Sequence, residues 1–336
     1  MFDITAYKDH PDHDLITEVF SACESWLESG EGFGVTSQIT GDGAVRMAEE
    51  KFSALHGGNM LSLLLPSATY GLRVALQAAG VKAGQNVCVA SYDWPAALAA
   101  VESVGAVPLF MPVDAFTFTL DPQAFRGIDL SKVAAIVTTH IHGVPADVPA
   151  IREVAGCKIP IIEDCSQALG STLDGKMVGT LGDIAVFSFG PGKSVSTCEG
   201  GMIITHSWDF YRNIIHEAAH PVRQIHSGND VNAAKFSLRP HPMTAIMLIA
   251  TMRSFQRETM CARSVALAEE LSLVEGAKLI GCDTRRQNAS GKVPILLECA
   301  DKLLIDRFTC AHSGAFDLEL SKRVPSAKPV YIVKEL

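Results

Sequence analysis

Residues 184–205 read IAVFSFGPGKSVSTCEGGMIIT, in which two apolar runs flank a Gly- and Pro-rich loop that carries one lysine, Lys193. Short apolar runs bounded by turn residues are typical of buried strands. The segment therefore predicts a strand, a tight loop and a second strand. Because a lysine in such a loop has little freedom to turn away, we interpret Lys193 as a positioned residue. The alternative is an ordinary solvated loop lysine.

Similar apolar runs come before this segment and alternate with helical patterns. Because the runs lack a polar face, they predict an α/β fold in which helices cover both sides of a mostly parallel sheet. The predicted strands are Met60–Leu65, Val87–Ser91, Val107–Met111, Val133–Thr139, Ile159–Glu163, Ile184–Ser188 and Met202–Thr205. The predicted helices cover residues 45–56, 67–79, 95–104 and 243 to about 275.

Length and composition fit two structural units. The chain has 336 residues, of which 48% are hydrophobic and 19% charged. This supply of apolar side chains excludes disorder for most of the chain. We expect a large domain over residues 1–240, with the N-terminal segment 1–44 included. A linking helix and a small, reduced α+β domain are expected over residues 241–336.

Charge and cysteine usage limit the partners and the compartment. The net charge is −9 and no basic stripe interrupts the acidic excess, so no nucleic-acid partner is expected. The N-terminus lacks a secretory pattern, and the longest apolar stretch, 243–252, is about half the ~20 residues that cross a bilayer, so no membrane partner is expected. Nine scattered cysteines without a Cys-x-x-Cys pair indicate reduced thiols and a cytoplasmic protein.

Two histidines are the best candidates for a metal site. His140 and His142 are two residues apart, which on a strand would place them on one face. No acidic or cysteine partner follows at ligand spacing, so the sequence predicts no metal.

A phosphate-binding P-loop is the second interpretation of the lysine loop. Gly192-Lys193-Ser194 matches the end of G-x-x-x-x-G-K-[ST], but the first glycine is replaced by Phe187. A strand rather than a helix also follows the loop, so this interpretation fails. The third interpretation is a Schiff-base lysine, whose amine becomes nucleophilic when it is partly desolvated and which needs an electron-sink cofactor.

Two other strand ends offer what pyridoxal phosphate requires, a carboxylate for its ring nitrogen and a cradle for its phosphate. Asp164 directly follows the predicted strand Ile159–Glu163, although a strand-end aspartate is also commonly a cap or loop residue. Ser67 opens a predicted helix, where the amides of Ala68 and Thr69, the two hydroxyls and the helix dipole favour an anion. Ser67 is equally well explained as a plain N-cap.

Taken in order, these motifs resemble the DegT/StrS-type sugar aminotransferases of the fold type I pyridoxal phosphate enzymes. The resemblance covers roughly residues 15–255 and implies a seven-stranded, mostly parallel sheet between helices. The motifs that carry it are Ser67-Ala68-Thr69, SYDW (91–94), HIHGVPAD (140–147), EDCSQALGS (163–171), FSFGPGK (187–193) and CEGG (198–201).

The resemblance assigns roles around the cofactor ring. Lys193 would bind the cofactor covalently, and Asp164 would pair with the ring nitrogen. Gln167 would lie near the phenolic oxygen. Trp94 would stack on the ring, whereas the alternative is a core tryptophan beside Pro95.

The resemblance also assigns a phosphate site and two substrate-side residues. The phosphate would be held by Ser188 and the Ser67-Ala68-Thr69 segment. His140 would line the site. The family usually shows Asn-x-Arg ahead of the helix that begins near 243, whereas SLRPHPMTA (237–245) has neither residue in register. Arg239 is the candidate replacement for that contact; the alternative is a surface charge.

The expected reaction is a ping-pong transamination. Glutamate or glutamine would donate the amino group, and a nucleotide-linked keto sugar or a keto cyclitol would accept it, in a homodimer with shared sites. The short C-terminal part favours one alternative, an enzyme of the same fold that acts on a non-sugar ketone or that eliminates or decarboxylates an amino acid. A pyridoxamine-dependent dehydratase, in which histidine replaces the lysine, is disfavoured by Lys193. A non-enzymatic cofactor-binding protein is disfavoured because the lysine, the aspartate and the phosphate site are all present.

Overall fold

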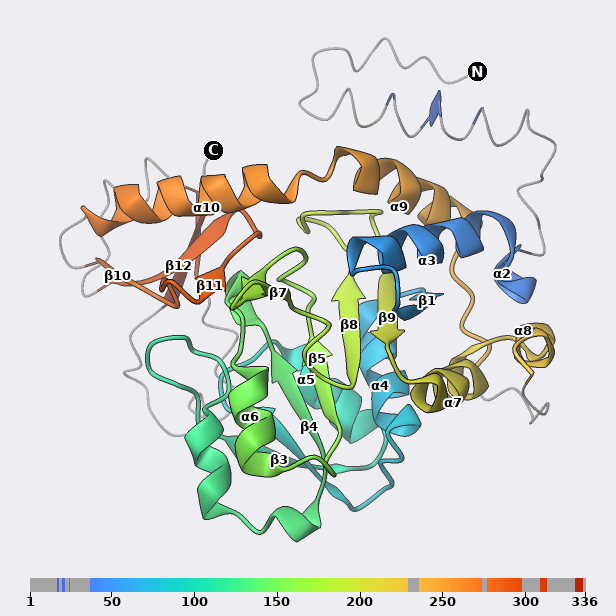
Figure 1. Cartoon of the computed structure of the whole chain (residues 1–336), viewed down its shortest axis with the longest axis horizontal. Coiled ribbons are helices and arrows are strands. Elements are labelled where there is room, and N and C mark those ends of the chain that lie inside the picture. Colours follow the sequence, from blue (N-terminus) through green and yellow to red (C-terminus); the bar gives the residue numbers. More distant parts are fainter. Residues whose placement is uncertain are drawn as a thin grey trace.

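The computed structural model describes residues 37–228, 236–273, 277–297, 309–312 and 330–334, together with residues 17, 20, 21 and 24. Most of the N-terminal segment expected in the large domain therefore lies outside the described residues. In Figure 1 a central sheet lies among helices, and α9 and α10 run end to end along one side of the molecule.

The predicted seven-stranded sheet is confirmed, with strand order β1-β9-β8-β5-β4-β2-β3. β9 pairs antiparallel with both β1 and β8, and the other neighbours pair in parallel. The strands are β1 (Leu61–Leu65), β2 (Asn86–Ala90), β3 (Val107–Met111), β4 (Val133–Thr139), β5 (Ile161–Asp164), β8 (Ile184–Ser188) and β9 (Gly201–Thr205).

Alternate side chains of the strands enter opposite layers, because successive residues of a strand face opposite sides. In β1, Leu63 and Leu65 join the core beneath α4, α5 and α7, whereas Leu64 joins the core beneath α3 and α9. In β2, Cys88 joins a third core cluster that includes residues of α6. Both faces are therefore covered, which explains why the strands read as continuous apolar runs.

The helices of the described chain begin where the sequence supplies caps. Pro95 stands in the first turn of α5, and the Ser67 hydroxyl accepts a hydrogen bond from the Tyr70 amide at the start of α4. No helix of this part of the chain is long and apolar enough to cross a membrane. The helices are α2 (Ser37–Thr40), α3 (Gly43–Leu55), α4 (Ala68–Ala78), α5 (Pro95–Ser103), α6 (Val148–Ala155), α7 (Trp208–Ala218), α8 (Pro221–His226), α9 (Pro242–Ser254) and α10 (Arg257–Ser272).

The helix-rich segment expected from 243 to about 275 is present and consists of two helices, α9 and α10. Phe255 and Gln256 have extended backbone angles between the two helices. The Phe255 ring packs closely over Gly170, and the guanidinium of Arg257 donates to the carbonyl of Gly170 at 2.7 Å. These contacts fix the turn between the two helices. The helical periodicity on either side of the turn does not predict them.

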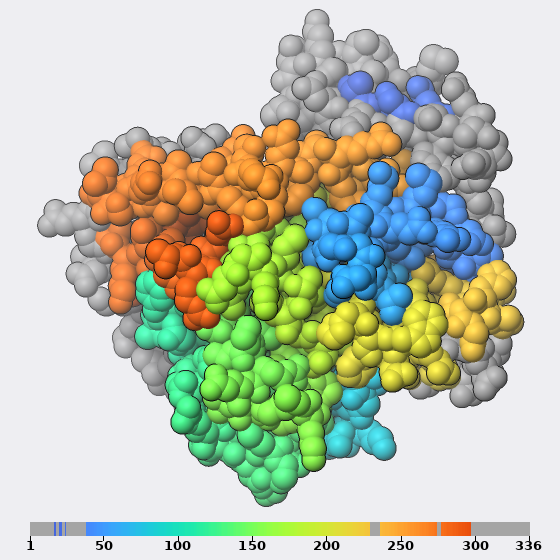
Figure 2. Space-filling model, in the orientation of Figure 1, coloured from blue at the N-terminus to red at the C-terminus, as the bar shows by residue number. Residues whose placement is uncertain are grey.

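The C-terminal part of the chain forms a second, antiparallel sheet and adds one strand to a third, three-stranded sheet. The strand order of the second sheet is β10-β12-β14-β13. The short strand β11 (Arg286–Gln287) pairs with β6 (Thr172–Leu173), which pairs in turn with β7 (Lys176–Met177). Figure 2 shows the orange-red segment lying against the green one. The strands of the second sheet are β10 (Ala277–Leu279), β12 (Lys292–Leu297), β13 (Thr309–His312) and β14 (Val330–Lys334).

A buried ion pair ties α3 and α8 to the edge strand β1. The guanidinium of Arg223 donates to the two carboxylate oxygens of Glu49 at 3.1 and 2.7 Å. The amide of Leu64 donates to the same carboxylate at 2.8 Å. Both charged side chains are only 9% exposed, so the attraction between them is needed to offset the cost of removing each charge from water.

We expect Glu49→Gln to lower the free energy of unfolding by about 3–5 kcal/mol, because it leaves the Arg223 charge buried without its partner. Urea denaturation of the full chain measures this difference. Glu50→Gln is the matched control: it removes the exposed pair with Arg46 and should lower the free energy by less than ~1 kcal/mol. Equal effects of the two variants would contradict the role given to the buried pair.

Candidate active site

The expected site residues gather where the parallel strands of the large sheet end. Asp164 is the last residue of β5, Ser188 is the last residue of β8, and Lys193 follows in the loop between β8 and β9. Trp94 lies just beyond β2. In open α/β sheets, ligands bind in the crevice outside the carboxyl ends of the strands.

Lys193 is held in a short, hydrogen-bonded loop. Its amide donates to the carbonyl of Gly190 at 3.4 Å, and the hydroxyl of Ser196 donates to the same carbonyl at 3.1 Å. Burial lowers the pKa of the Lys193 amine, the negative charge of Asp164 raises it, and the positive charge of Lys292 lowers it further, so that the pKa lies below its ordinary value. A lysine in this setting is a better nucleophile than a solvated one.

Asp164 is fixed by its backbone and by its neighbour. The side chain belongs to a residue that is 2% exposed, and its Oδ1 accepts a hydrogen bond from the Ser166 amide at 2.9 Å. Its carbonyl accepts from the His140 amide at 3.0 Å, which continues the pairing of β4 with β5. The carboxyl group is therefore oriented and lies close enough to Lys193 to act on its charge.

The first turn of α4 lies against the start of β9. A Cβ atom on Gly201 would lie 2.6 Å from the Ala68 nitrogen and 2.7 Å from the Ser67 carbonyl carbon. Only glycine allows this close approach. Gly201 is also the register partner of Ser188. Ser188 and the amides of Ala68 and Thr69, which are expected to hold a phosphate, are thereby brought to one place.

Ser67 itself acts as the N-cap of α4. Its hydroxyl accepts from the Tyr70 amide at 3.4 Å, as the simpler interpretation of this residue has it. Trp94 is 48% exposed at the N-terminus of α5, so it is not a core tryptophan. The side-chain oxygen of Gln167 accepts from the His142 amide at 2.9 Å, which fixes Gln167 beside the loop that follows β4.

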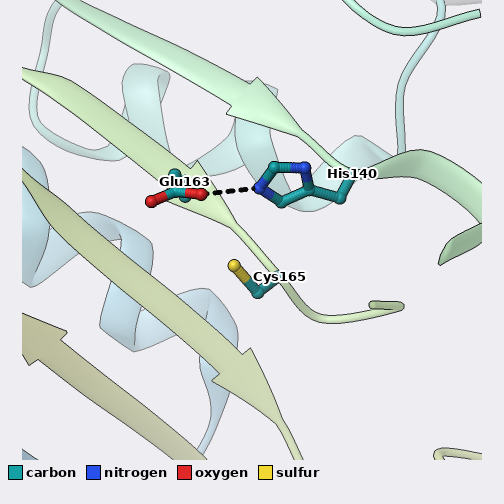
Figure 3. A group of neighbouring side chains, drawn as sticks. All are labelled: His140, Glu163 and Cys165. Atoms are coloured by element: carbon teal, nitrogen blue, oxygen red, sulfur yellow. Dashed lines mark hydrogen bonds and ion pairs between the residues drawn. The ribbon is translucent and has the colours of Figure 1, made fainter. Parts of the chain in front are cut away.

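His140 does not lie where the sequence interpretation placed it. It is fully buried, its Nδ1 accepts from the Ala146 amide at 2.9 Å, and its Nε2 lies 2.9 Å from the carboxylate of Glu163. Because Nδ1 accepts, Nε2 carries the hydrogen and donates it. Both nitrogens are thus used inside the protein, so His140 supports the site instead of lining it for a substrate (Figure 3).

The shared face expected for the two histidines is also wrong. β4 ends at Thr139, and His140 and His142 lie at a short turn in which His142 adopts φ 57°. His140 consequently meets Glu163, whereas the Nε2 of His142 lies 2.9 Å from the hydroxyl of Tyr92. The expectation was wrong because it assumed that the strand continues through His140 and His142, whereas β4 ends at Thr139.

Three potential metal ligands, His140, Glu163 and Cys165, lie close together although their spacing in the sequence does not indicate it. Their ligand atoms lie within 4.8 Å of one another, and Figure 3 shows the Cys165 thiol pointing toward the other two. Burial favours the neutral form of Glu163, but hydrogen bonds from His140 and from backbone amides outweigh burial and lower the pKa of Glu163. This saturated carboxylate supports a structural use of the cluster.

Two further residues of the site, Asn288 and Lys292, were missed by sequence reasoning. Besides its contact with Tyr92, His142 accepts through its carbonyl from the side chain of Asn288 at 3.2 Å. Lys292, at the start of β12, donates from Nζ to the carbonyl of Gly192 at 3.0 Å. Burial first, and the charge of Lys292 second, lower the pKa of His142 to about 3. No motif links the C-terminal strand to the lysine loop, so only the fold reveals these contacts.

A family model for DegT/DnrJ/EryC1/StrS aminotransferases matches residues 34–309. The chain belongs to this family. The resemblance seen in the motifs is therefore confirmed, and the match extends beyond the expected residue 255 into the C-terminal sheet.

Individual members of the family are similar over different shares of their length. An L-glutamine:2-deoxy-scyllo-inosose aminotransferase of Streptomyces lividus is 39% identical over 195 residues, which cover 57% of this chain and 44% of the relative. A 3-amino-5-hydroxybenzoate synthase of Amycolatopsis mediterranei (strain S699) is 28% identical over 305 residues, 86% of this chain and 76% of the relative. The chain spans less than half of the length of the Streptomyces lividus enzyme and of two other relatives that it matches.

The fold is shared with solved structures. A crystal structure of GDP-4-keto-6-deoxymannose-3-dehydratase with bound GDP-perosamine superimposes with a TM-score of 0.78 at 16% identity, covering 95% of this chain and 93% of the other. This family architecture agrees with the fold type I sheet expected from the motifs.

Arg239 lies in the described segment 236–240 ahead of α9 and is exposed. The family contact at this place would be made to a neighbouring subunit, so a single chain does not test it. The role of Arg239 stays a prediction.

We expect Lys292→Met to raise the pKa of Lys193, because the variant removes a positive charge that lowers it. The pH dependence of reductive methylation at Lys193, followed by mass spectrometry on the full chain, measures the change. The midpoint should move to higher pH. Lys278→Met, which removes an exposed lysine of β10, is the control and should leave the midpoint in place. A midpoint that stays or falls in Lys292→Met would contradict the coupling.

Proposed function

We propose that this protein is a pyridoxal-phosphate-dependent aminotransferase that moves an amino group from an amino acid to the ketone of a keto sugar or keto cyclitol. The observation that carries the proposal is the partly buried amine of Lys193, which is electrostatically coupled to Asp164 at the edge of the sheet. Membership of an aminotransferase family supports it.

The residues present fit the chemical features of pyridoxal phosphate. The cofactor has an aldehyde, a ring nitrogen and a phosphate, which need an amine, a carboxylate and an anion site. Lys193 and Asp164 supply the first two. The anion site would be the first turn of α4, with the amides of Ala68 and Thr69, because Gly201, the register partner of Ser188, lies against Ser67 and Ala68. Gln167 would bind near the phenolic oxygen, and the exposed indole of Trp94 would cover the ring.

When bound, pyridoxal phosphate supplies an electron sink that stabilises negative charge on the carbon that loses a proton. Lys193 would hold the cofactor covalently and, once released from it, would move a proton with its amine, a task that suits a lysine with a lowered pKa. Asp164 would hold the ring nitrogen and would keep it protonated. Overall, an amino acid becomes a keto acid, and a ketone becomes an amine.

The relatives support glutamine or glutamate as donor and a keto cyclitol as acceptor, since one is named L-glutamine:2-deoxy-scyllo-inosose aminotransferase. A second candidate function rests on another match: 3-amino-5-hydroxybenzoate synthase aligns with 86% of this chain, more than the cyclitol enzyme does. The alternative is therefore an enzyme with the same cofactor that acts on a non-sugar ketone, or on an amino acid by elimination or decarboxylation. A stoichiometric keto acid from the donor distinguishes transamination from the last two reactions.

A GDP-4-keto-6-deoxymannose-3-dehydratase shares this fold, so a pyridoxamine-dependent dehydratase is the alternative to weigh. By the resemblance described above, such dehydratases have a histidine at the position that Lys193 occupies in this chain. The lysine supports transamination instead.

The assembly and the compartment are part of the proposal. We propose a homodimer with shared sites: Tyr70 and Trp94, 47% and 48% exposed beside the phosphate and ring positions, are apolar surfaces that a second subunit would cover. Arg239 would contact the phosphate in the partner subunit.

The proposal also includes two domains, a cofactor domain over residues 1–240 and a smaller unit over residues 241–336. Six of the described cysteines are free, which supports a cytoplasmic protein.

We expect the purified chain with pyridoxal phosphate to show a coloured absorbance band. Lys193→Ala should lose this band, because the variant has no side-chain amine at position 193 to bind the cofactor covalently. Absorbance spectroscopy after removal of excess cofactor measures this. Lys176→Ala, at an exposed lysine of β7, should keep the band. A colourless wild-type chain that cannot be reconstituted would exclude the proposal.

We expect Asp164→Asn to keep the covalent cofactor but to slow transamination by roughly 10²–10⁴-fold, because the ring nitrogen loses the charge that keeps it protonated. The rate at which glutamate or glutamine bleaches the band in a single turnover measures this step. A rate within about threefold of the wild type would refute the role of Asp164.

A further inference from the structure

Asp93 is a second buried acid at the cofactor edge of the sheet, and neither the motifs nor the proposed reaction gives it a role. The residue is 0% exposed. Its Oδ1 accepts from the Trp94 amide at 2.7 Å, and its Oδ2 accepts from the hydroxyl of Thr139 at 2.9 Å. Both oxygens are thus held, one by the loop after β2 and the other by the end of β4.

Thr139 connects Asp93 to Asp164. Thr139 and Asp164 are register partners on the parallel strands β4 and β5, so their side chains leave the same face of the sheet. The hydroxyl that reaches Asp93 therefore stands beside the carboxyl group expected to meet the cofactor ring. Three neighbouring strand ends place Asp93, Thr139 and Asp164 in a row.

The charges around Asp93 favour its protonated form. Burial first, and the negative charge of Asp164 second, raise the pKa of Asp93 to about 8, although the hydrogen bonds from Thr139 and Trp94 lower it. Within the described chain, Asp164 on β5 is the charge that acts on Asp93, whereas Lys193 after β8 is coupled to Asp164. Tyr92 and His142, the other titratable groups nearby, are hydrogen-bonded to each other.

We propose that Asp93 is a positioning residue of the cofactor site: its Oδ1 fixes the Trp94 backbone, its Oδ2 holds Thr139 beside Asp164, and its charge state acts on Asp164 and Lys193. Ionisation of Asp93 in alkaline solution adds a second negative charge beside Asp164. That charge strengthens the hold on a proton at the ring nitrogen and on the Lys193 ammonium. Only this effect on the cofactor rests on the proposed function.

The first test compares the unfolding of wild type and Asp93→Asn by urea between pH 5 and pH 9, on the full chain without added cofactor. An aspartate whose pKa is raised on folding stabilises the fold fully below its unfolded pKa, near 4, and loses that contribution as pH rises to about 8. The ratio of the unfolding constants, wild type over variant, should therefore rise about tenfold per pH unit from pH 5 to just below 8 and then level off.

Asp129→Asn is the control, because Asp129 is an exposed cap whose pKa is lowered by hydrogen bonds from Ser131. Its contribution is lost only in acid, so its ratio should stay constant from pH 5 to 9. A constant ratio for Asp93→Asn as well would overturn the proposal, since Asp93 would then be ionised throughout. If Asp93→Asn does not fold, Thr139→Val removes a hydrogen bond that lowers the pKa of Asp93 and should move the levelling-off to higher pH; no movement would overturn the proposal equally.

The second test follows the cofactor band of the loaded chain against pH. An inflection near pH 8 is expected in wild type and should be absent in Asp93→Asn. An inflection that persists in the variant would exclude an influence of Asp93 on the cofactor. A chain that binds no cofactor would refute the proposed function but would leave the urea result as a separate answer on Asp93.

Discussion

The arrangement of the site depends on one buried carboxylate, that of Glu163. It accepts hydrogen bonds from Nε2 of His140 and from the amides of Gly179, Leu181 and Gly182, at 2.6–2.9 Å. These donors come from the turn after β4 and from the loop ahead of β8, so one side chain joins three neighbouring strands. Asp164 follows directly in the chain. The hydrogen bonds of Glu163 therefore also fix the position of Asp164 at the edge of the sheet.

The same carboxylate explains why two glycines stand in the loop that it holds. A Cβ atom on Gly182 would lie 2.8 Å from the carbonyl oxygen of Ile161, and one on Gly179, where φ is +88°, would lie 2.5 Å from the Phe187 ring. The backbone has to come this close for its amides to reach a side chain inside the sheet. Loss of the Glu163 side chain would leave these donors buried without an acceptor, which costs more stability than the loss of the bonds themselves.

The central sheet could be predicted because its information is local. Every predicted strand lies within two residues of the observed one, since buried parallel strands are written as continuous apolar runs, and Lys193, Asp164 and the α4 terminus follow from their places at strand ends. What failed depends on contacts between distant residues. The side-chain contacts of His140 are set by Glu163. Lys292 and Asn288 reach the site only through the fold, and neither periodicity nor spacing reports such contacts.

The hydrogen bond from Lys292 to the carbonyl of Gly192 joins the last third of the chain to the lysine loop. A substitution of Lys292 therefore also alters the proton affinity of Lys193, about a hundred positions earlier in the chain. The start of β12 and the lysine loop cannot change independently of each other. A chimaera built by joining two such proteins at α9 would have to keep a positive charge at position 292 to keep the proton affinity of Lys193.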